Sequence, residues 1–413
     1  MRIAVIGAGV SGLVAARLLS RENDVSVFEA EDYAGGHTRT VDVPSGGRTW
    51  AVDTGFIVYN KENYPEFTRL LARLSVATKP STMSFSARCE RTGLEYCPSS
   101  LNALFVQRKN LLRPAFWRML ADVGRFRREA TGLIRTGDDG PTLGDFLARR
   151  YSRLFIEHLI VPMGAAIWSS PPGRVLDMPA LFFARFFSQH RFLDATGQPR
   201  WRVVEGGSRE YVAPLVAPFR DRIRLSTPVA SVRRFEECVE VTPEGGTPER
   251  FDHAVIAAHS DQALRMLADA SGAEREILSA IPYQENRVVL HTDTSFLPKG
   301  RAAWAAWNYL VPARATDRVT VTYDMNILQG LPAPVEFLVT LNGAEGVRRG
   351  AVLRELTYHH PVFRREGVAA QGRRGEINGA RRTWYCGAYW GNGFHEDGVR
   401  SAIEVARAFG AAP

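Results

Sequence analysis

Three glycines near the N-terminus have the spacing of a loop that binds phosphate groups. Gly7, Gly9 and Gly12 follow the apolar residues 2–6 directly, and Glu29 closes the next apolar stretch. The first glycine permits a tight turn, the second lets the backbone approach a pyrophosphate, and the third allows close packing of a helix on a strand. An acid at position 29 accepts hydrogen bonds from a ribose diol and disfavours a 2′-phosphate. The expected chemistry is therefore binding of FAD or NAD in preference to NADP.

A strand–helix–strand unit must position these residues. Residues 2–6 and 24–28 predict two buried strands, and residues 13–19 have the apolar pattern of a helix. The start of that helix offers free N–H groups and a positive dipole to the phosphates. Strand, glycines, helix, second strand and acid occur in the order that the motif requires. This context favours a dinucleotide site over a glycine-rich turn in another kind of α/β unit.

Length and composition indicate a globular enzyme with more than one domain. The 413 residues exceed the usual limit for one core, and 45% hydrophobic with 23% charged residues is ordinary for a soluble protein. No apolar run approaches the roughly 20 residues needed to cross a bilayer. Because the first strand begins at residue 2, no room is left for a signal peptide, and we expect a cytoplasmic protein.

The cysteines and histidines do not predict a metal site. The four cysteines are scattered and contain no C-x-x-C pair, so reduced thiols are expected. The nine histidines lack the spacing of metal ligands, and the adjacent His359 and His360 are expected to diverge on a strand. We therefore predict no structural metal.

The net charge of +8 indicates an anionic partner or location. No recognised binding motif accompanies the charge, so we expect no nucleic acid partner. Residues 101–128 offer a better explanation, because apolar and basic residues are interleaved there and Asp122 is the only acid. The basic residues are Arg108, Lys109, Arg113, Arg118, Arg125, Arg127 and Arg128. Two interpretations stay open: a segment bound to an anionic membrane surface, peripheral on the inner face, and a solvated helix packed on its own domain.

Cofactor-type elements at both ends and in the middle of the chain predict two interleaved domains. The cofactor-binding domain is assigned residues 1–75, 196–283 and 371–413, and a sheet of the substrate domain is assigned residues 284–370. Residues 76–195 are expected to be mostly helical and to face the substrate or the membrane. Within them, residues 180–187 place four phenylalanines on adjoining turns. These rings belong either to the core or to an apolar substrate channel.

Further motifs give the chain a resemblance to a known family. They are Gly35-Gly36 with Thr40, Asp53-Thr-Gly55, Thr227-Pro-Val229, and Cys386-Gly387 with Glu396-Asp-Gly398. Together with the N-terminal unit, they resemble the motifs of the flavin-containing amine oxidase superfamily, which also includes phytoene desaturases and protoporphyrinogen oxidase. The resemblance covers essentially the whole chain. It implies an α/β fold in which an FAD-binding Rossmann-like domain of the glutathione-reductase type is interleaved with an α+β substrate domain.

The resemblance also implies which residues bind FAD. They are Gly7, Gly9, Val10, Ser11, Gly12, Glu29 and Ala30; Gly35, Gly36, His37 and Thr38; Gly55, Phe56 and Ile57; Val229; and Gly387, His395, Glu396 and Asp397. His37 stands where the family usually has arginine. The last group precedes an expected helix over 399–409, and N–H groups at a helix start stabilise the negative charge of a reduced flavin. The monoamine oxidases of this superfamily attach their flavin through a cysteine upstream of the C-terminal motif. Because no cysteine lies between Cys238 and Cys386 here, we predict noncovalent FAD.

Three short sequence segments narrow the resemblance to one branch of the superfamily. Residues 53–60, 303–308 and 393–398 are similar to a bacterial branch of predicted NAD/FAD-binding proteins. That branch is associated with enzymes that methylate or cyclopropanate unsaturated acyl chains, including the route to furan fatty acids. It implies a flavin-dependent desaturase that acts on a methylated acyl chain of a membrane phospholipid, with a lipid methyltransferase as a candidate partner. The strand that carries a lysine in many amine oxidases here begins Asn286-Arg287, which favours a substrate other than an amine.

The reaction implied is removal of hydride from a C–H bond by flavin N5, with loss of a proton from the neighbouring carbon. His395 is the candidate base, because a neutral imidazole suits proton removal at neutral pH. The alternative is that only its backbone contacts FAD. Asn308, Tyr323 and Asn326 are candidates for the pocket wall, with a hydrogen-bonded core role as the alternative.

Two other functions stay open. An oxidase of amines or small polar molecules predicts peroxide production and a pocket that carries a carboxylate or an aromatic cage. A non-catalytic FAD protein that assists a lipid methyltransferase predicts a flavin that no candidate substrate reduces.

Overall fold

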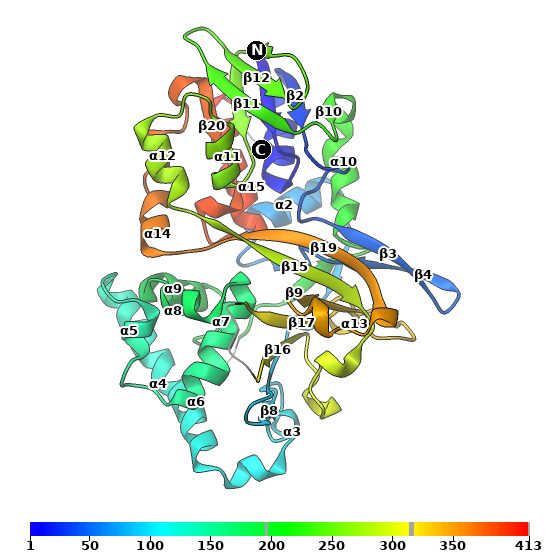
Figure 1. Ribbon diagram of the computed structural model, residues 1–413, viewed down its shortest axis with the longest axis vertical. Coiled ribbons are helices and arrows are strands. Elements are labelled where there is room, and N and C mark those ends of the chain that lie inside the picture. Colours follow the sequence, from blue (N-terminus) through cyan, green and yellow to red (C-terminus); the bar gives the residue numbers. More distant parts are fainter. Residues whose placement is uncertain (195–196, 314–317, 412–413) are drawn as a thin grey trace.

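The computed structural model describes residues 1–194, 197–313 and 318–411. A parallel sheet with its helices occupies one end of the molecule, where both termini lie, and the helices α4 to α9 gather at the other end (Figure 1). The long strands β15 and β19 cross the molecule between these two parts (Figure 1). The predicted α/β fold, a cofactor-type domain interleaved with a substrate domain, is confirmed.

The cofactor-type domain is built on a five-stranded sheet in which every strand pair is parallel. Its order is β10 (Ile223–Arg224), β2 (Asp24–Phe28), β1 (Arg2–Ile6), β14 (His253–Ile256) and β20 (Thr383–Tyr385). Because parallel strands point the same way, the loops that leave their carboxyl ends meet along one edge of the sheet. Segments from the start, middle and end of the chain therefore converge there.

Both faces of this sheet are buried, which explains the nearly continuous apolar runs of its strands. Ile3 and Val5 of β1 share a core with helices α1 (Val10–Leu19) and α15 (His395–Ala408). Ala4 and Ile6 point the other way, into a core with a three-stranded antiparallel sheet. That sheet consists of β11 (Val229–Arg234), β12 (Val239–Pro243) and β13 (Glu249–Phe251). Helices α2 (Pro65–Arg73), α10 (Val212–Val216), α11 (Ser260–Met266), α12 (Gly272–Ser279) and α14 (Arg365–Gln371) complete the domain.

The second domain contains a seven-stranded mixed sheet. Its order is β19 (Val352–Pro361), β15 (Tyr283–His291), β18 (Leu338–Leu341), β17 (Thr320–Asp324), β16 (Trp307–Val311), β7 (Phe85–Cys89) and β8 (Glu95–Tyr96). Two smaller sheets link it to the first domain: β3 (Thr40–Ser45) with β4 (Arg48–Asp53), and β5 (Val58–Asn60) with β9 (Trp201–Val204) and β6 (Thr78–Pro80). Helix α13 (Met325–Leu328) follows β17.

The region expected to be mostly helical, residues 76–195, begins instead with strands. β6, β7 and β8 occupy its first part, and β7 pairs in parallel with β16, which lies far along the chain. Such long-range pairing is not visible in a local pattern, which is why the sequence did not indicate it. The helices begin only at Leu101.

The helical part covers one side of the seven-stranded sheet. Its elements are α3 (Leu101–Leu104), η1 (Arg108–Leu112), α4 (Pro114–Thr136), α5 (Leu143–Leu147), α6 (Arg153–Phe155), η2 (Ile156–Ile160), α7 (Val161–Trp168), α8 (Pro172–Leu176) and α9 (Ala180–Gln189). The phenylalanines of α9 pack with those of α4, and the rings of Phe183 and Phe187 stack with centroids 4.2 Å apart. None of the helices that the structure describes is both long and apolar enough to cross a membrane.

A buried ion-pair network fixes β11 relative to β20. The side chain of Arg234 on β11 is fully buried and contacts both carboxylate oxygens of Glu274, at 2.8 and 2.9 Å. Tyr385 on β20 donates a hydrogen bond of 2.5 Å to the same carboxylate. Burial alone would raise the pKa of Glu274, but the Arg234 guanidinium and its other donors lower that pKa to about 2. The network thereby holds together two strands whose ends contribute to the site described next.

Candidate functional site

One cavity of about 1180 Å³ extends from the carboxyl edge of the parallel sheet into the second domain. Its wall includes Gly7 after β1, Glu29 after β2, Ala257 after β14 and Gly387 after β20. On the other side it is lined by residues of α4, α7, α9, β16 and β19. The outer edge of parallel strands is the place where α/β domains bind nucleotides.

The three glycines of the N-terminal loop have different environments. Gly7 has a φ of +104°, a conformation that favours glycine, and a Cβ on Gly12 would lie only 1.9 Å from the oxygen of Gly7. Gly9 has φ −72°, and a Cβ added to it would meet no atom within 4 Å, so the space beside it is cavity. Gly9 is also the N-cap of α1, and no side chain caps this helix. Its first N–H groups therefore remain available to an anionic ligand.

Glu29 is oriented by the backbone. Its Oε2 accepts a hydrogen bond of 2.6 Å from the N–H of Ala8, and its Oε1 accepts one of 2.9 Å from the N–H of Glu31. Burial raises the pKa of this carboxyl, against the effect of these two bonds. The carbonyl of Glu29 also accepts from Thr227 at 2.7 Å, which brings the start of β11, with Val229, to the same end of the cavity. A carboxylate fixed in this way fits the ribose of a bound dinucleotide.

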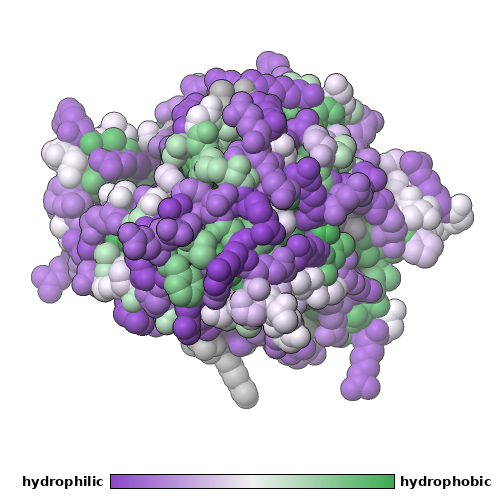
Figure 2. Space-filling view, turned by 90° about the horizontal axis from the view of Figure 1, so that it is seen from above, coloured by the Kyte–Doolittle hydropathy of each residue, from purple (hydrophilic) through white to green (hydrophobic). Residues whose placement is uncertain are grey.

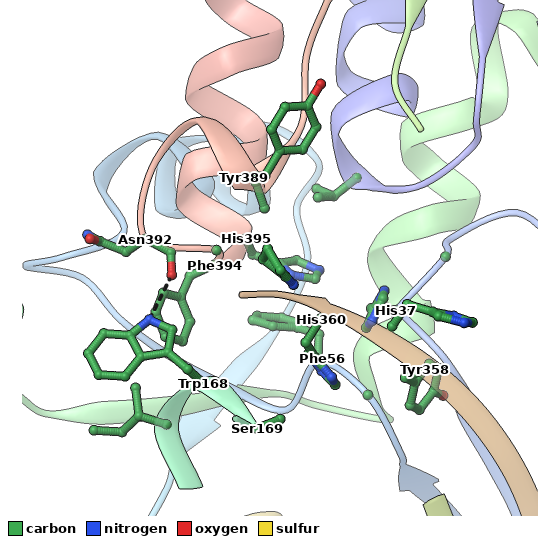
Figure 3. Close-up of a pocket in the computed structure, with 18 of the residues that line it drawn as sticks. His37, Phe56, Trp168, Ser169, Tyr358, His360, Tyr389, Asn392, Phe394 and His395 are labelled. Atoms are coloured by element: carbon green, nitrogen blue, oxygen red, sulfur yellow. Dashed lines mark hydrogen bonds between the residues drawn. The ribbon is translucent and has the colours of Figure 1, made fainter. Parts of the chain in front are cut away.

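His37 faces the cavity with a nitrogen that has no partner. Its Nε2 is buried and makes no hydrogen bond with the described residues. The ring stacks on Tyr358, with centroids 4.9 Å apart, and lies 5.3 Å from the ring of His360 (Figure 3). Burial lowers the pKa of His37 to about 4, so its imidazole is neutral. A buried, unsatisfied nitrogen beside an uncapped helix start fits a ligand such as FAD that supplies the missing partner.

The turn before α15 presents backbone to the cavity and turns its acids away. Asp397 accepts hydrogen bonds from the N–H groups of Asn392 and Phe394, at 2.9 and 3.0 Å. Glu396 accepts from the N–H groups of residues 66 and 67 at the start of α2. Neither acid lines the cavity, whereas Gly387 and His395 do. The two carboxylates thus fix the position of the helix start.

His395 is held by three neighbours. Its Nε2 lies 3.0 Å from Thr38 Oγ1 and 3.1 Å from Tyr211 Oη, and its ring stacks on Phe56 with centroids 3.6 Å apart. Burial lowers the pKa of His395 well below its ordinary value, so the ring is neutral as expected. The contacts at Nε2 hold the ring in the turn, and a role of His395 as the base stays a prediction.

The cavity gathers most of the residues expected to bind FAD. Those on its wall are Gly7, Gly9, Val10, Ser11, Glu29, Ala30, Gly35, Gly36, His37, Gly55, Phe56, Ile57, Val229, Gly387 and His395. Gly12, Thr38 and Asp397 do not line it but pack on or hydrogen-bond to residues that do, whereas Glu396 hydrogen-bonds to α2 outside the wall. Cys386 is buried outside the wall, and burial raises the pKa of its thiol to about 12. Such a thiol is a poor nucleophile, in keeping with the prediction of noncovalent FAD.

Of the three residues expected on the pocket wall, only Tyr323 lies there among the residues that line the cavity. Tyr323 lines the cavity, and its ring meets that of Trp307 edge to face at 5.3 Å. Asn308 does not, because Ser86, Ala305 and Thr322 hydrogen-bond its amide inside the sheet. Asn326 likewise bonds to the backbone of residues 335 and 337. These two asparagines have the core role that was the alternative.

The second half of the cavity is lined by aromatic residues, which include Phe186 and Phe187 from the phenylalanine cluster that the sequence placed either in the core or in a channel. Trp168 ends α7 and donates a hydrogen bond of 3.1 Å to the carbonyl of Asn392, which joins the helical part to the turn before α15 (Figure 3). Phe186 of α9 stacks on Phe394 of that turn, with centroids 5.3 Å apart. Among the described residues, the only acids on the cavity wall are Glu29 and Glu31, at the adenosine end. The second half therefore contains no carboxylate.

A Rossmann-like sheet, an uncapped helix start and an acid fixed for a ribose define a dinucleotide-binding protein. A model of the flavin containing amine oxidoreductase family matches residues 10–326. The chain therefore belongs to this family, and FAD is its cofactor. When bound, FAD accepts hydride from a substrate C–H bond. A search of curated proteins by sequence found no match.

Solved structures share the whole fold. Cyclohexylamine oxidase from Brevibacterium oxydans has a TM-score of 0.70 at 17% identity, over 98% of both chains. A CLA-producing fatty acid isomerase from P. acnes has a TM-score of 0.71 at 18% identity, over 99% of this chain and 98% of that one. A putative protoporphyrinogen oxidase from Exiguobacterium has a TM-score of 0.67 at 18% identity, with the same coverage. At these identities the similarity establishes the fold alone.

Replacing Gly9 by alanine should weaken FAD binding and leave the fold intact, because the added Cβ points only into the cavity. We expect the dissociation constant for FAD to rise by about tenfold or more, equivalent to about 1.4 kcal/mol. Replacing Gly12 by alanine should instead lower the stability of the apoprotein, since its Cβ would collide with the backbone of Gly7. Thermal unfolding of both apoproteins, together with titration by FAD, tests this difference. Unchanged FAD affinity in G9A would contradict the placement of the pyrophosphate.

Proposed function

We propose that this protein is an FAD-dependent desaturase that removes hydride from a methylated, unsaturated acyl chain of a membrane phospholipid. A proton leaves the neighbouring carbon, and a new double bond forms between the two carbons. The observation that carries the proposal is the long apolar half of the cavity, which continues from Phe394 past α9 and α7 to α4. The similarity of residues 53–60 and 393–398 to the lipid-associated branch supports the methylated substrate.

The wall of this half suits an uncharged hydrocarbon chain. Phe186, Phe187 and Ile160 are buried and line it together with Met163 and Leu159. Burial of a cationic amine is unfavourable without a compensating carboxylate, and the described residues place no acid in this half of the cavity. An apolar enclosure also excludes water from a hydride transfer. One solved structure of the same fold is named as a fatty acid isomerase, which supports an acyl substrate.

His190 is the side chain best placed to accept the proton. It ends α9, lines the cavity and stacks on Phe186, with centroids 4.0 Å apart. Its Nδ1 lies 3.1 Å from the carbonyl of Phe186, and a hydrogen bond to this oxygen fixes the proton on Nδ1. Nε2 is then left as an acceptor. Burial lowers the pKa of His190 to about 4, so the ring is neutral before the reaction.

Anaerobic titration of the FAD-loaded protein should show bleaching of the flavin by phospholipids with methylated unsaturated chains, and none by primary amines. His190→Gln should keep its FAD and its affinity for the lipid but be reduced more slowly, by about 10²–10⁴-fold, the usual contribution of a general base. Reduction by amines and not by lipids would support an amine oxidase instead. A flavin that no substrate reduces, in a stable complex with a lipid methyltransferase, would support the non-catalytic alternative.

The segment 101–128 supports docking of the protein on an anionic membrane surface. It is divided into α3, η1 and α4, at the end of the molecule opposite the termini (Figure 1). Phe105, Phe116 and Phe126 are buried in the domain. Part of the segment therefore packs on its own domain, as the second of the two interpretations expected. Leu112 and Trp117 remain 87% and 49% exposed, and Leu101 and Leu111 are exposed as well.

The charges around these apolar side chains have one sign. Arg108, Lys109, Arg113 and Arg118 are exposed between them. The single acid, Asp122, is buried and bound to the N–H of Ser152 and to Arg125. The end of the molecule that carries the termini, opposite this segment, presents mainly hydrophilic side chains, with apolar side chains scattered among them (Figure 2). Exposed leucine and tryptophan amid cations is the composition of an interfacial segment.

The double variant L112Q/W117Q should bind vesicles that contain phosphatidylglycerol at least about 10²-fold more weakly than the wild type, because each of the two apolar side chains contributes about 1.5–3 kcal/mol when it is buried in the membrane. Cosedimentation with vesicles measures the change, and binding should weaken further with added salt. Leu353→Gln is the matched control, because Leu353 is also exposed but lies on β19, outside the segment. Equal binding by the double variant and the control would contradict the docking surface.

A further inference from the structure

Among the residues that the structure describes, one cation at the far end of the apolar cavity has no ion-pair partner. Arg127 of α4 lines the cavity beside Val123 and Phe126. Its Nε is buried and makes no hydrogen bond, and no ion pair of its guanidinium occurs among the described residues. Arg127 is half-buried, and burial of its Nε–H without an acceptor is unfavourable, so an oxyanion in the cavity would supply the missing partner.

The neighbouring arginines of α4 show that this environment belongs to Arg127 alone. Arg125 pairs with Asp122 and donates to the carbonyl of Arg150. Arg128 is exposed and does not line the cavity. The acids of the cavity wall, Glu29 and Glu31, lie at the adenosine end and belong to the dinucleotide site. The chain thus offers Arg127 no counter-ion from within the described wall.

A continuous row of rings joins Arg127 to the flavin end. Phe126, its neighbour in the chain, contacts Phe187 with ring centroids 6.1 Å apart. Phe187 is next to Phe186, whose ring stacks on Phe394 at 5.3 Å. Phe394 directly precedes the start of α15. The cavity therefore has a cationic end, an apolar length and a redox end.

We propose that Arg127 binds the acidic head group of the acyl substrate, a carboxylate or a phosphate, while the chain lies along Phe187 and Phe186 toward the flavin. This inference rests on the proposed function, since it assumes an acyl substrate. A guanidinium pairs with either oxyanion in a bidentate manner. Binding at this end sets which carbons of the chain reach the reacting position, so Arg127 determines the position of the new double bond.

The test compares three ligands with the same chain, oleate, oleoyl lysophosphatidylglycerol and oleyl alcohol, in titrations of the FAD-loaded protein followed by flavin absorbance. We expect the wild type to bind at least one of the two acidic ligands about tenfold more tightly than the alcohol. Arg127→Gln should lose this preference and bind the alcohol as the wild type does. Arg128→Gln removes the same charge one residue away and should behave as the wild type.

The outcomes separate the two proposals. Preference for the lysophospholipid, lost in R127Q alone, identifies a phosphate and supports the inference with a phospholipid substrate. Preference for oleate, lost in R127Q alone, identifies a carboxylate; it supports the inference and replaces the phospholipid by a free fatty acid as the acyl substrate. Unchanged preference in R127Q, with FAD content and melting temperature equal to those of R128Q, overturns the inference and leaves the acyl substrate in place. If none of the three ligands perturbs the flavin of the wild type, the proposed function is overturned together with it.

Discussion

The N–H groups in the first turn of α1 need an acceptor that no capping side chain supplies. Gly9 caps this helix without a side chain, and the space beside its Cα is open. Around this point lie Glu29, fixed by two backbone N–H groups, and His37, with its unsatisfied Nε2. Without a ligand, the N–H groups of α1 and Nε2 of His37 lack hydrogen-bond partners, and the Glu29 carboxylate has no ribose to bind. A single dinucleotide supplies a partner for all three. The cofactor is therefore a structural element of this domain as well as its reagent.

Hydrogen bonds elsewhere in the structure hold segments that are distant in the sequence in place around that ligand. Asp53 is fully buried and accepts hydrogen bonds from Thr40 and Ser208, while Gln329 bonds to both its backbone and its carboxylate. The Arg234 network ties β11 to β20, and Trp168 ties α7 to the turn before α15. The bonds of Gln329 and Trp168 join the two domains, whereas the Arg234 network fixes strands within the cofactor-type domain.

The sequence predicted well what short segments encode. The N-terminal strand, glycine loop, helix and Glu29 form one local unit, and the structure has all of them. It also predicted the residues from distant motifs that line the cavity, because each motif carries its own glycines or turn. Asn308 was ambiguous for a physical reason: a polar residue on a sheet has the same appearance in sequence whether it faces a pocket or hydrogen-bonds inside, as it does here.

The sequence could not predict what pairing over long distances creates. β6, β7 and β8 fall in a region with helical composition, and they become strands because they pair with β9 and β16. His360, on β19, and Trp168, at the end of α7, come from segments without a motif, and only the fold brings them to one cavity. Similarly, the apolar side chains of residues 101–128 divide into buried phenylalanines and an exposed group around Trp117, and this division depends on what packs beneath them.

The proposed reaction requires the apolar half of the cavity to hold an acyl chain between the flavin and α4. A crystal structure of the FAD-loaded protein with a brominated fatty acid tests this placement directly, because the anomalous signal of bromine locates the chain. We expect peaks beside Phe186 and Phe187, in line with the flavin ring. Clear density for FAD with no bromine peak in the cavity, or with bromine only on the protein surface, would contradict this placement of the chain.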